Sequence, residues 1–373
     1  MAPPHVAIDG RLWAAYWTGT SSYLRGIGRA LWARTSGYRY SLLTGGDGRG
    51  QPVTEDDDVD ETVFDPPHLM DEMWEQVSFP TYLASKGTDA LFAPGGVIPL
   101  AREFAAIPVI HDLGFLHHPE YYEPRLGEYL ARWVEVSCRT AEMVICNSGF
   151  TRRAVMEEYG VPQARCRTVP PAPGPGFSQE GPEDEPKAIK EEFGLQTPYL
   201  LAVSSGGRNK NLPGLLEAFQ LLIESHPDLP HVLAVVGPPG SVREEAGQRG
   251  VETRVRAVGR VPAGWLAALY RCAEAFVFPS LYEGFGLPPL EAMACGCPVV
   301  TSDRAALPET VGEAALLCDP ADAEQMCELL ANLAEDPDLR NEMAGRGLER
   351  AGGYTWDRSA ALVERVFEEV LGD

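Results

Sequence analysis

Short apolar runs alternate with amphipathic stretches along most of this chain. Apolar segments at 6–8, 40–44, 90–93, 107–110 and 143–146 predict buried strands, and apolar residues at helical spacing predict helices at 23–32, 74–83 and 126–141. The same alternation starts again at 199–203 and continues to a helix at 356–371. Strands that alternate with helices are typical of a doubly wound parallel sheet, so the chain is predicted to be α/β.

A stretch rich in proline, glycine and acidic residues separates two halves of the pattern. It covers residues 170–186 and has the composition of a linker. A chain of 373 residues also suggests two domains at roughly 150 residues each. We therefore expect Rossmann-like domains at 1–175 and 187–352, with the amphipathic final helix, 356–373, packing back on the first.

Residues 276–302, FVFPSLYEGFGLPPLEAMACGCPVVTS, carry the most specific spacing in the chain. They predict a strand at 276–278, a loop, a helix at 290–294 and a second strand at 299–301. A helix N-terminus favours an anion, and Gly284 and Gly286 allow close approach to the backbone. Glu283 stands in the loop and Glu291 in what is expected to be the first helical turn. By itself the pattern fits either a ligand loop or an ordinary tight turn.

Other polar residues follow predicted strands, where ligands of parallel α/β sheets bind. His111 ends the strand at 107–110, and Arg208 and Lys210 lie in the loop SSGGRNKN after 199–203. His117 and His118 are interpreted as structural. Arg208 and Lys210 could equally form a basic surface loop.

Composition excludes several classes of partner. The net charge of −23 repels nucleic acid and anionic lipid at long range, so no nucleic-acid partner is expected. No apolar run reaches the roughly 18 residues that cross a membrane, and the first ten residues lack the features of a signal peptide. We therefore expect a cytoplasmic protein, with membrane docking and oligomeric state left open.

No metal site is predicted. The eight cysteines contain no CxxC pair and are expected to be buried, reduced thiols. The acidic run at 54–62 contains Asp58-Val59-Asp60, a D-x-D pattern that binds a metal–nucleotide in some sugar-transferring enzymes. Because no apolar strand leads into it, a solvated loop is the preferred interpretation.

The spacing of Glu283 and Glu291, with GFGLPPL between them, resembles the E-x7-E motif of retaining glycosyltransferases of family 4. Pro279-Ser280 before the motif and Gly296, Pro298 and Val299 after it agree as well. The resemblance covers Ile8-Asp9 to Trp356, and HDLGFLHHPEYY and SDRAALPETVGEAALLCDP are similar to the mannosyltransferase-like branch.

This resemblance implies the GT-B fold, two Rossmann-like domains facing across a cleft. It also implies transfer of a mannose- or glucose-type sugar from a donor such as GDP-mannose or UDP-glucose, with retention and without a metal or other cofactor. The acceptor would be a glycan, a lipid-linked molecule or a small molecule. A catalytically silent GT-B-like binding or scaffold protein, and another GT-B enzyme such as a sugar-nucleotide epimerase or phosphorylase, remain as alternatives.

The resemblance also assigns roles to residues. Glu291 would bind the ribose hydroxyls, Glu283 the donor sugar, and Lys210 the diphosphate, while His111 would face the sugar from the first domain. Arg208 fits less well than Lys210 because the family spaces its arginine differently. Further donor contacts are expected from the first loop, from the loop that holds Glu283 and from the end of the strand at 255–258: Gly19, Gly284, Phe285, Gly286, Leu287 and Arg260. The first loop, WTGTSSY, departs from the family's glycine-rich form, which leaves acceptor recognition open, and front-face attack is not distinguished from a covalent route.

Overall fold

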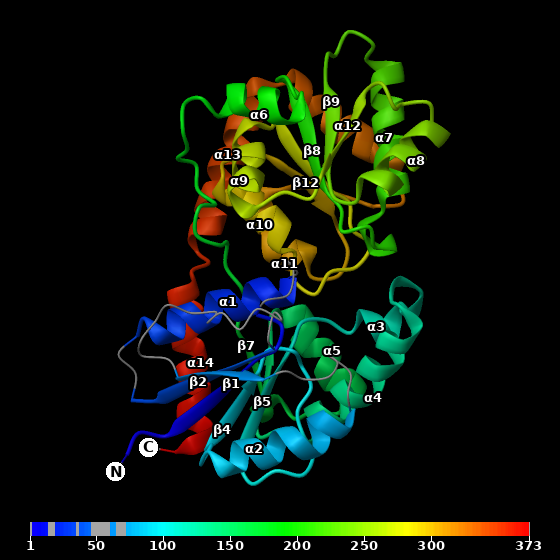
Figure 1. Ribbon diagram of the computed structural model, residues 1–373. Helices are drawn as coiled ribbons and strands as arrows, with labels where there is room; N and C mark the ends of the chain where they lie inside the picture. The colour runs from blue at the N-terminus through cyan, green and yellow to red at the C-terminus, as the bar shows by residue number, and fades with distance from the viewer. Residues whose placement is uncertain (1, 14–18, 35–36, 46–59, 65–71, 373) are drawn as a thin grey trace. The chain divides into compact units, whose positions relative to one another are not determined.

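The computed structural model describes residues 2–13, 19–34, 37–45, 60–64 and 72–372. The chain divides into two units, residues 1–172 with 355–373, and residues 173–354. Each unit is an α/β structure built on a parallel sheet, which confirms the predicted fold class (Figure 1). Asp58 and Val59 of the D-x-D pattern lie outside the described residues.

The sheet of the first unit has the spatial order β3-β2-β1-β4-β5-β6-β7. Its strands are β1 His5–Gly10, β2 Arg39–Gly45, β3 Asp60–Phe64, β4 Ala90–Ala93, β5 Ala105–Ile110, β6 Val144–Cys146 and β7 Cys166–Thr168. Its helices are α1 Gly19–Trp32, the π-helix η1 Trp74–Ser78, α2 Phe79–Ser85, α3 Gly114–His117, η2 Pro119–Tyr121, α4 Pro124–Thr140, α5 Gly149–Tyr159, η3 Gln163–Arg165 and α14 Trp356–Leu371.

The sheet of the second unit has the order β10-β9-β8-β11-β12-β13. Its strands are β8 Tyr199–Val203, β9 Val232–Val236, β10 Val255–Gly259, β11 Ala275–Phe278, β12 Val299–Ser302 and β13 Leu316–Cys318. Its helices are α6 Glu185–Phe193, η4 Arg208–Lys210, α7 Leu212–Ser225, α8 Pro239–Gln248, α9 Ala263–Cys272, α10 Leu287–Ala294, α11 Leu307–Val311, η5 Gly312–Ala314, α12 Ala323–Glu335 and α13 Pro337–Gly352.

Strand β11 illustrates why the apolar runs are continuous. Phe276 and Phe278 point into the core layer that α9 and α10 cover, whereas Ala275 and Val277 point into the layer under α7 and α12. Helices on both faces bury every position of a central parallel strand, so no polar alternation is needed. This is the physical basis of the correctly predicted strands.

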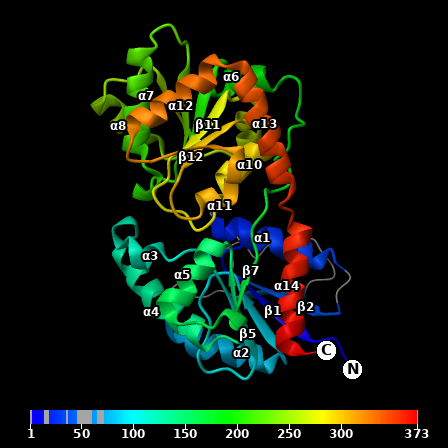
Figure 2. The same cartoon turned by 180° about the vertical axis from the view of Figure 1, so that it is seen from behind.

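The last helix packs on the first helix of the chain. Figures 1 and 2 show α1 and α14 side by side in the first unit. A Cβ added to Gly26 would lie 2.2 Å from Cε2 of Trp356, so only glycine allows this approach. Arg34 donates to Glu364 over 2.7 Å, and Ser359 donates to the carbonyl of Pro170 over 2.6 Å. The final segment of the sequence therefore completes the first unit.

One strand was predicted wrongly as a loop. Residues 60–64 form β3, which pairs in parallel with β2 at the edge of the sheet. The acidic residues at its start concealed it, because an edge strand has one neighbour and needs a less continuous apolar run than a central strand.

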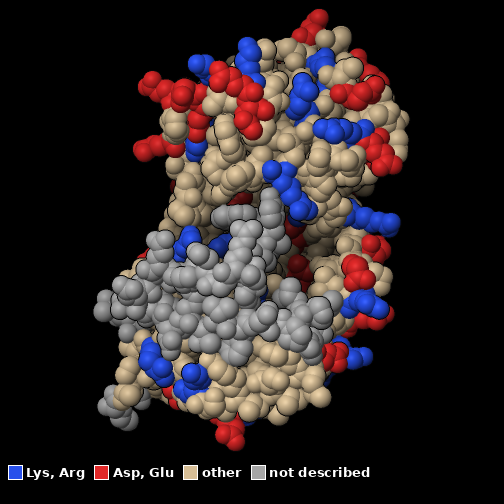
Figure 3. All heavy atoms as spheres, viewed as in Figure 1, with Lys and Arg blue, Asp and Glu red and all other residues tan. Residues whose placement is uncertain are grey.

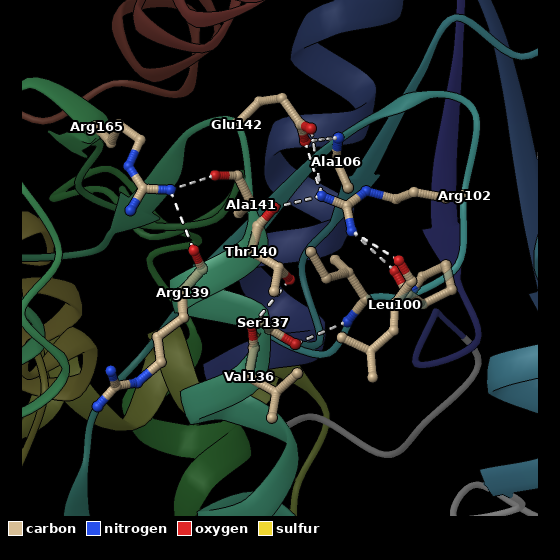
Figure 4. Close-up of polar contacts among 12 residues, drawn as sticks. Leu100, Arg102, Ala106, Val136, Ser137, Arg139, Thr140, Ala141, Glu142 and Arg165 are labelled. Carbon is tan, nitrogen blue, oxygen red and sulfur yellow. Dashed lines mark hydrogen bonds and ion pairs between the residues drawn. The ribbon is translucent and has the colours of Figure 1, made fainter.

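Arg102 and Arg165 connect the end of α4 to the starts of β5 and β7 through hydrogen bonds and an ion pair (Figure 4). Arg102 donates to the carbonyls of Pro99 and Thr140 and pairs with Glu142 over 3.0 Å. Glu142 also accepts the N–H of Ala106 over 2.7 Å, and Arg165 donates to the carbonyl of Ala141 over 2.8 Å. These contacts satisfy carbonyls at the helix C-terminus, and they lie at the amino-terminal edge of the sheet.

Candidate active site

The strand order of the second sheet reverses between β8 and β11. These strands are hydrogen-bonded neighbours, with Leu200 opposite Ala275 and Leu201 opposite Phe276, although more than 70 positions separate them. The connections from the two strands leave to opposite sides, and the crevice at such a switch point is where doubly wound folds bind ligands. The loops that hold Lys210 and Glu283 both begin here.

Lys210 and Glu283 form an ion pair at this edge. The Lys210 Nζ atom contacts Glu283 Oε1, and the two side chains are only 15% and 16% exposed. Nζ also lies 4.9 Å from the centre of the Phe278 ring. An ion pair this far from bulk water is screened less than a surface pair. The structure therefore brings together two residues that were predicted to bind different ends of a donor.

Backbone and side-chain hydrogen bonds join the two loops beside the ion pair. The carbonyl of Asn209 accepts the N–H of Leu281 over 2.7 Å, and Asn209 Nδ2 donates to the carbonyl of Tyr282 over 3.2 Å. Ser280 Oγ lies 2.8 Å from the Asn209 carbonyl and 2.7 Å from Glu283 Oε1. Asn209 and Ser280 were not predicted as site residues; the available signals were the position of Asn209 beside Lys210 and that of Ser280 three residues before Glu283.

Helix α10 begins earlier than predicted and offers fewer amides than a standard helix N-terminus. It starts at Leu287, with Gly286 as N-cap at φ +101°, and Pro288 and Pro289 carry no N–H. In the described part of the chain, the N–H groups of Phe285, Gly286 and Leu287 have no hydrogen-bond partner. These three amides are therefore the donors that this loop can offer to an anion or a hydroxyl. The Phe285 ring is buried against Tyr354, so only its backbone is available.

The segment after β12 braces this glycine loop. Ala306 N–H donates to the Glu283 carbonyl over 3.2 Å, and Thr310 Oγ1 donates to the Phe285 carbonyl over 2.5 Å. A Cβ at Gly286 would lie 2.6 Å from Cδ2 of Leu307. Packing and hydrogen bonds therefore hold the loop of residues 283–287 in place.

Glu291 lies in the second turn of α10, not in the first as expected, because the helix begins at Leu287. Burial raises the pKa of its carboxyl from 4.5 to about 8. The carboxyl has neither a hydrogen bond nor an ion pair with the residues that the structure describes. A desolvated carboxyl without a protein partner is suited to receive hydroxyl groups from a ligand.

The other predicted donor residues are more exposed. Arg208 lines a cavity of about 280 Å³ that the loop after β8 forms with Ser241, Glu244 and Gln248 near α8. Arg260 follows β10 at the surface, and the cation of Lys210 is the more deeply placed of the basic groups in this region. On the face of the second unit seen in Figure 3, acidic and basic side chains are interspersed. With a net charge of −23, attraction of any anionic ligand has to come from such local groups.

In the first unit, His111 follows β5 as predicted. Its Nε2 atom lies 2.9 Å from the carbonyl of Pro94, and because a carbonyl only accepts, Nε2 carries the proton. Burial lowers the pKa of His111, although the Pro94 carbonyl and Asp112 oppose the shift. The ring is therefore neutral at pH 7, with a lone pair on Nδ1. Asp112 serves the local fold, since it accepts from Gly114 N–H and the Tyr122 hydroxyl.

Comparison with known proteins identifies the family. Residues 17–172 match the model described as Glycosyltransferase Family 4, and residues 184–350 match the one described as Glycosyl transferases group 1. O-antigen chain mannosyltransferase B of Escherichia coli is 34% identical over 256 residues, which are 68% of this chain and 67% of the relative. The chain belongs to glycosyltransferase family 4. The sequence-based resemblance, including its mannosyltransferase-like branch, is confirmed.

Other relatives of this family 4 glycosyltransferase cover different shares of their own chains. A D-inositol 3-phosphate glycosyltransferase from Actinosynnema mirum is 32% identical over 70% of this chain and 66% of its own. The serotype-specific mannosyltransferase WbdA of Escherichia coli is 26% identical over 71% of this chain, but the match spans only 32% of WbdA. HepE from Anabaena, solved with UDP-glucose, has a TM-score of 0.77 at 16% identity over 98% of this chain and 99% of its own. At that identity the likeness shows the fold alone.

A buried charged cluster in the first unit of the family 4 chain was not predicted. At the carboxyl end of β1, Arg11 pairs with Asp9 over 2.7 Å and with Glu75 over 2.5 Å, and all three side chains are buried. The Tyr129 hydroxyl donates to the Glu75 carboxylate. Burial raises the pKa of Glu75, although the nearby Arg11 opposes this shift. The spacing Asp9-Gly10-Arg11 after an apolar strand was the only local signal, because Glu75 comes from the distant η1.

Gly19, the cysteines and the search for metal sites complete the description of the predicted features. A Cβ at Gly19 would meet no described atom within 4 Å, so the described residues do not require glycine at the start of α1. All eight cysteines are free, and all except Cys272 are buried. Among the described residues, no three His, Cys, Asp or Glu side chains are arranged to hold a metal ion, and no helix is long and apolar enough to span a membrane.

Proposed function

We propose that this family 4 glycosyltransferase moves a mannose- or glucose-type sugar from a nucleotide-diphosphate donor to a hydroxyl acceptor, with retention and without a bound metal. The observation that carries the proposal is the meeting of Lys210 and Glu283 at the switch point of the second sheet. Glu291 follows on α10, beside the free amides of Phe285, Gly286 and Leu287. Cation, carboxylates and amides thus occur together where a doubly wound sheet binds nucleotides.

The charge that the reaction creates indicates which groups should bind the diphosphate of the donor. As the sugar leaves, negative charge grows on the nucleoside diphosphate, and fixed positive groups lower the energy of that state. Lys210 is a partly buried cation at the carboxyl-terminal edge of the second sheet. The amides of Phe285, Gly286 and Leu287 add uncharged hydrogen-bond donors. We assign the diphosphate to Lys210 and these amides, with Arg208 as a second, more exposed cation.

The hydroxyl-bearing ends of the donor suit the two carboxylates. Glu291 has a desolvated carboxyl without a described partner, and we assign the vicinal ribose hydroxyls to it. Glu283 Oε1 is occupied, but Oε2 has no hydrogen-bond partner among the described residues, and we assign a hydroxyl of the donor sugar to that oxygen. His111 can accept a hydroxyl proton at Nδ1 because its Nε2 proton is committed to Pro94.

Relatives support the choice of substrates. A mannosyltransferase that builds O-antigen chains is 34% identical, which supports mannose and a glycan acceptor. The fold neighbour HepE is described with UDP-glucose, which supports a nucleotide-diphosphate donor. Retention and independence of metal rest on the resemblance of Glu283 and Glu291 to the E-x7-E motif.

A donor screen tests the proposal. The purified chain is heated with GDP-mannose, UDP-glucose and dTDP-sugars, and the true donor should raise the melting temperature by mass action. Glu291→Ala should weaken binding of that donor about tenfold or more and abolish transfer, as the loss of hydrogen bonds to two ribose hydroxyls predicts. Glu324→Ala, which removes an exposed carboxylate of α12, should change neither. Transfer by Glu291→Ala at the wild-type rate would contradict the assignment.

Analysis of the product tests retention of configuration, independence of metal and the alternative enzyme classes separately. Proton NMR of the first product formed should show the anomeric configuration of the donor, and EDTA should leave the rate unchanged. An inverted product contradicts retention, and loss of activity in EDTA contradicts metal independence. Turnover that needs no acceptor, or that needs inorganic phosphate, would instead indicate an epimerase or a phosphorylase.

A further inference from the structure

The hydroxyl of Ser280 touches both loops of the candidate site. It lies 2.7 Å from Glu283 Oε1 and 2.8 Å from the carbonyl of Asn209, the residue before Lys210, and Ser280 itself is fully buried. We propose that Ser280 is a positioning residue, which holds Glu283 toward the donor sugar while Lys210 leaves Glu283 for the diphosphate. This inference rests on the proposed function.

The proton of Ser280 is available to Glu283. A hydroxyl carries one proton, so it donates to only one of the two oxygens at a time. The Asn209 carbonyl already accepts the N–H of Leu281 over 2.7 Å and does not depend on the serine. A hydrogen bond to a charged acceptor is roughly twice as strong as one to a neutral acceptor. The serine proton therefore belongs on the carboxylate.

Both protein partners of Glu283 bind the same oxygen. Lys210 Nζ and Ser280 Oγ contact Oε1, and Oε2 is without a partner in the described part of the chain. A carboxylate held at one oxygen by two donors presents the other oxygen in a defined direction. In the free protein this arrangement orients Oε2 before any sugar arrives.

Binding of the donor would remove one of these two partners. A diphosphate carries more negative charge than a carboxylate, so at equal distance it attracts the Lys210 ammonium more strongly. The lysine side chain is flexible, whereas the hydrogen bonds of the Asn209 carbonyl with Leu281 and of the Asn209 side chain with Tyr282 fix the loops on which Lys210 and Glu283 stand. The exchange thus needs movement of Lys210 alone, and Ser280 remains as the bond that keeps Oε1 in place.

The experiment separates nucleotide binding from use of the sugar. Ser280→Ala should bind GDP or UDP, whichever the wild type binds, within about twofold, because the nucleotide contacts Lys210, Glu291 and the amides. Its kcat for transfer should fall about ten- to a hundredfold, the factor for losing a hydrogen bond to a charged group. The added affinity of the nucleotide sugar over the free nucleotide should shrink as well. Ser280→Cys, of similar volume and with a weak S–H donor, should give the same result if the alanine variant does not fold.

Ser137 provides the matched control. It is also fully buried, and its hydroxyl accepts the N–H of Ile98 over 3.0 Å in the first unit (Figure 4). Ser137→Ala should lower the melting temperature without changing kcat or the ratio of the two affinities. The inference is overturned if Ser280→Ala keeps the wild-type kcat, or if it loses nucleotide affinity as strongly as kcat. If the wild type itself neither binds a nucleotide nor transfers a sugar, the proposed function fails instead.

Discussion

Lys210 and Glu283 stand 73 positions apart in the chain and form a nearly buried ion pair in the second unit. With the roles proposed for these residues, the free protein neutralises its diphosphate-binding cation with its own sugar-binding carboxylate. This keeps a desolvated charge from standing alone, which would be costly. It also means that a donor competes with an internal partner for each of the two groups.

Removal of the cation should affect donor binding first. Lys210→Ala leaves Glu283 without its ion-pair partner and the diphosphate without its principal positive group, so nucleotide affinity should fall about ten- to a hundredfold and transfer at least as much. Calorimetric titration with the free nucleotide and initial-rate assays measure the two effects. Lys187→Ala, at a side chain that is 76% exposed on α6, is the control and should behave as wild type. Equal nucleotide affinity in the Lys210 and Lys187 variants would disprove the role of Lys210.

The carboxyl of Glu291 should make stability depend on pH. Its pKa is about 8 in the folded protein and ordinarily 4.5, so between these values the unfolded state has lost a proton that the folded state keeps. The free energy of unfolding should therefore fall as pH rises, by at most ~1.4 kcal/mol per pH unit from this group. Glu291→Gln cannot ionise and should gain stability relative to wild type from about pH 5 to about pH 8. Urea unfolding over this range checks the sign, and parallel curves for the two proteins would refute it.

Gly286 should not tolerate a side chain. Its φ of +101° is unfavourable for other residues, and a Cβ would meet Leu307 at 2.6 Å. Gly286→Ala should lower the free energy of unfolding by about 1–3 kcal/mol and disturb the amides on either side, so donor affinity should fall too. Gly247→Ala in α8, where a Cβ meets no atom within 4 Å, should be neutral or stabilising by up to about 1 kcal/mol. The same thermal and binding assays on both variants make the comparison.

Because Gly26 packs against Trp356, substitutions at these two positions should have non-additive effects on the free energy of unfolding. Gly26→Ala drives a Cβ into the indole, which would lie 2.2 Å away, and overpacking of this kind costs about 1–3 kcal/mol. Trp356→Leu should be destabilising by itself but should relieve most of the cost of Gly26→Ala. A double-mutant cycle by chemical unfolding measures this coupling. Strictly additive effects would show that α1 and α14 do not pack as described.

Much of the fold followed from local patterns. The strands β1, β4, β5, β8 and β11 were predicted because burial on both faces makes them continuous apolar runs. Helix α14 was predicted from Trp356 to Leu371, because an amphipathic helix shows its apolar face in sequence. The acidic start of β3 and the prolines in the first turn of α10 misled the prediction, since both elements depend on neighbours or caps more than on their own composition.

The candidate site, like the fold, could be predicted only in part from the sequence. The sequence by itself determined that Glu283, Glu291, Lys210 and His111 follow strands or open a helix, because spacing and strand ends can be read along the chain. Only the tertiary structure decided that Lys210 and Glu283 share an ion pair, that Ser280 and Asn209 join their loops, and that Arg11 lies between Asp9 and Glu75. Those contacts arise where β8 meets β11 and where η1 meets β1. Pairing between distant segments is set by the order of strands in a sheet and by the packing around it, and neither leaves a periodic trace in the sequence.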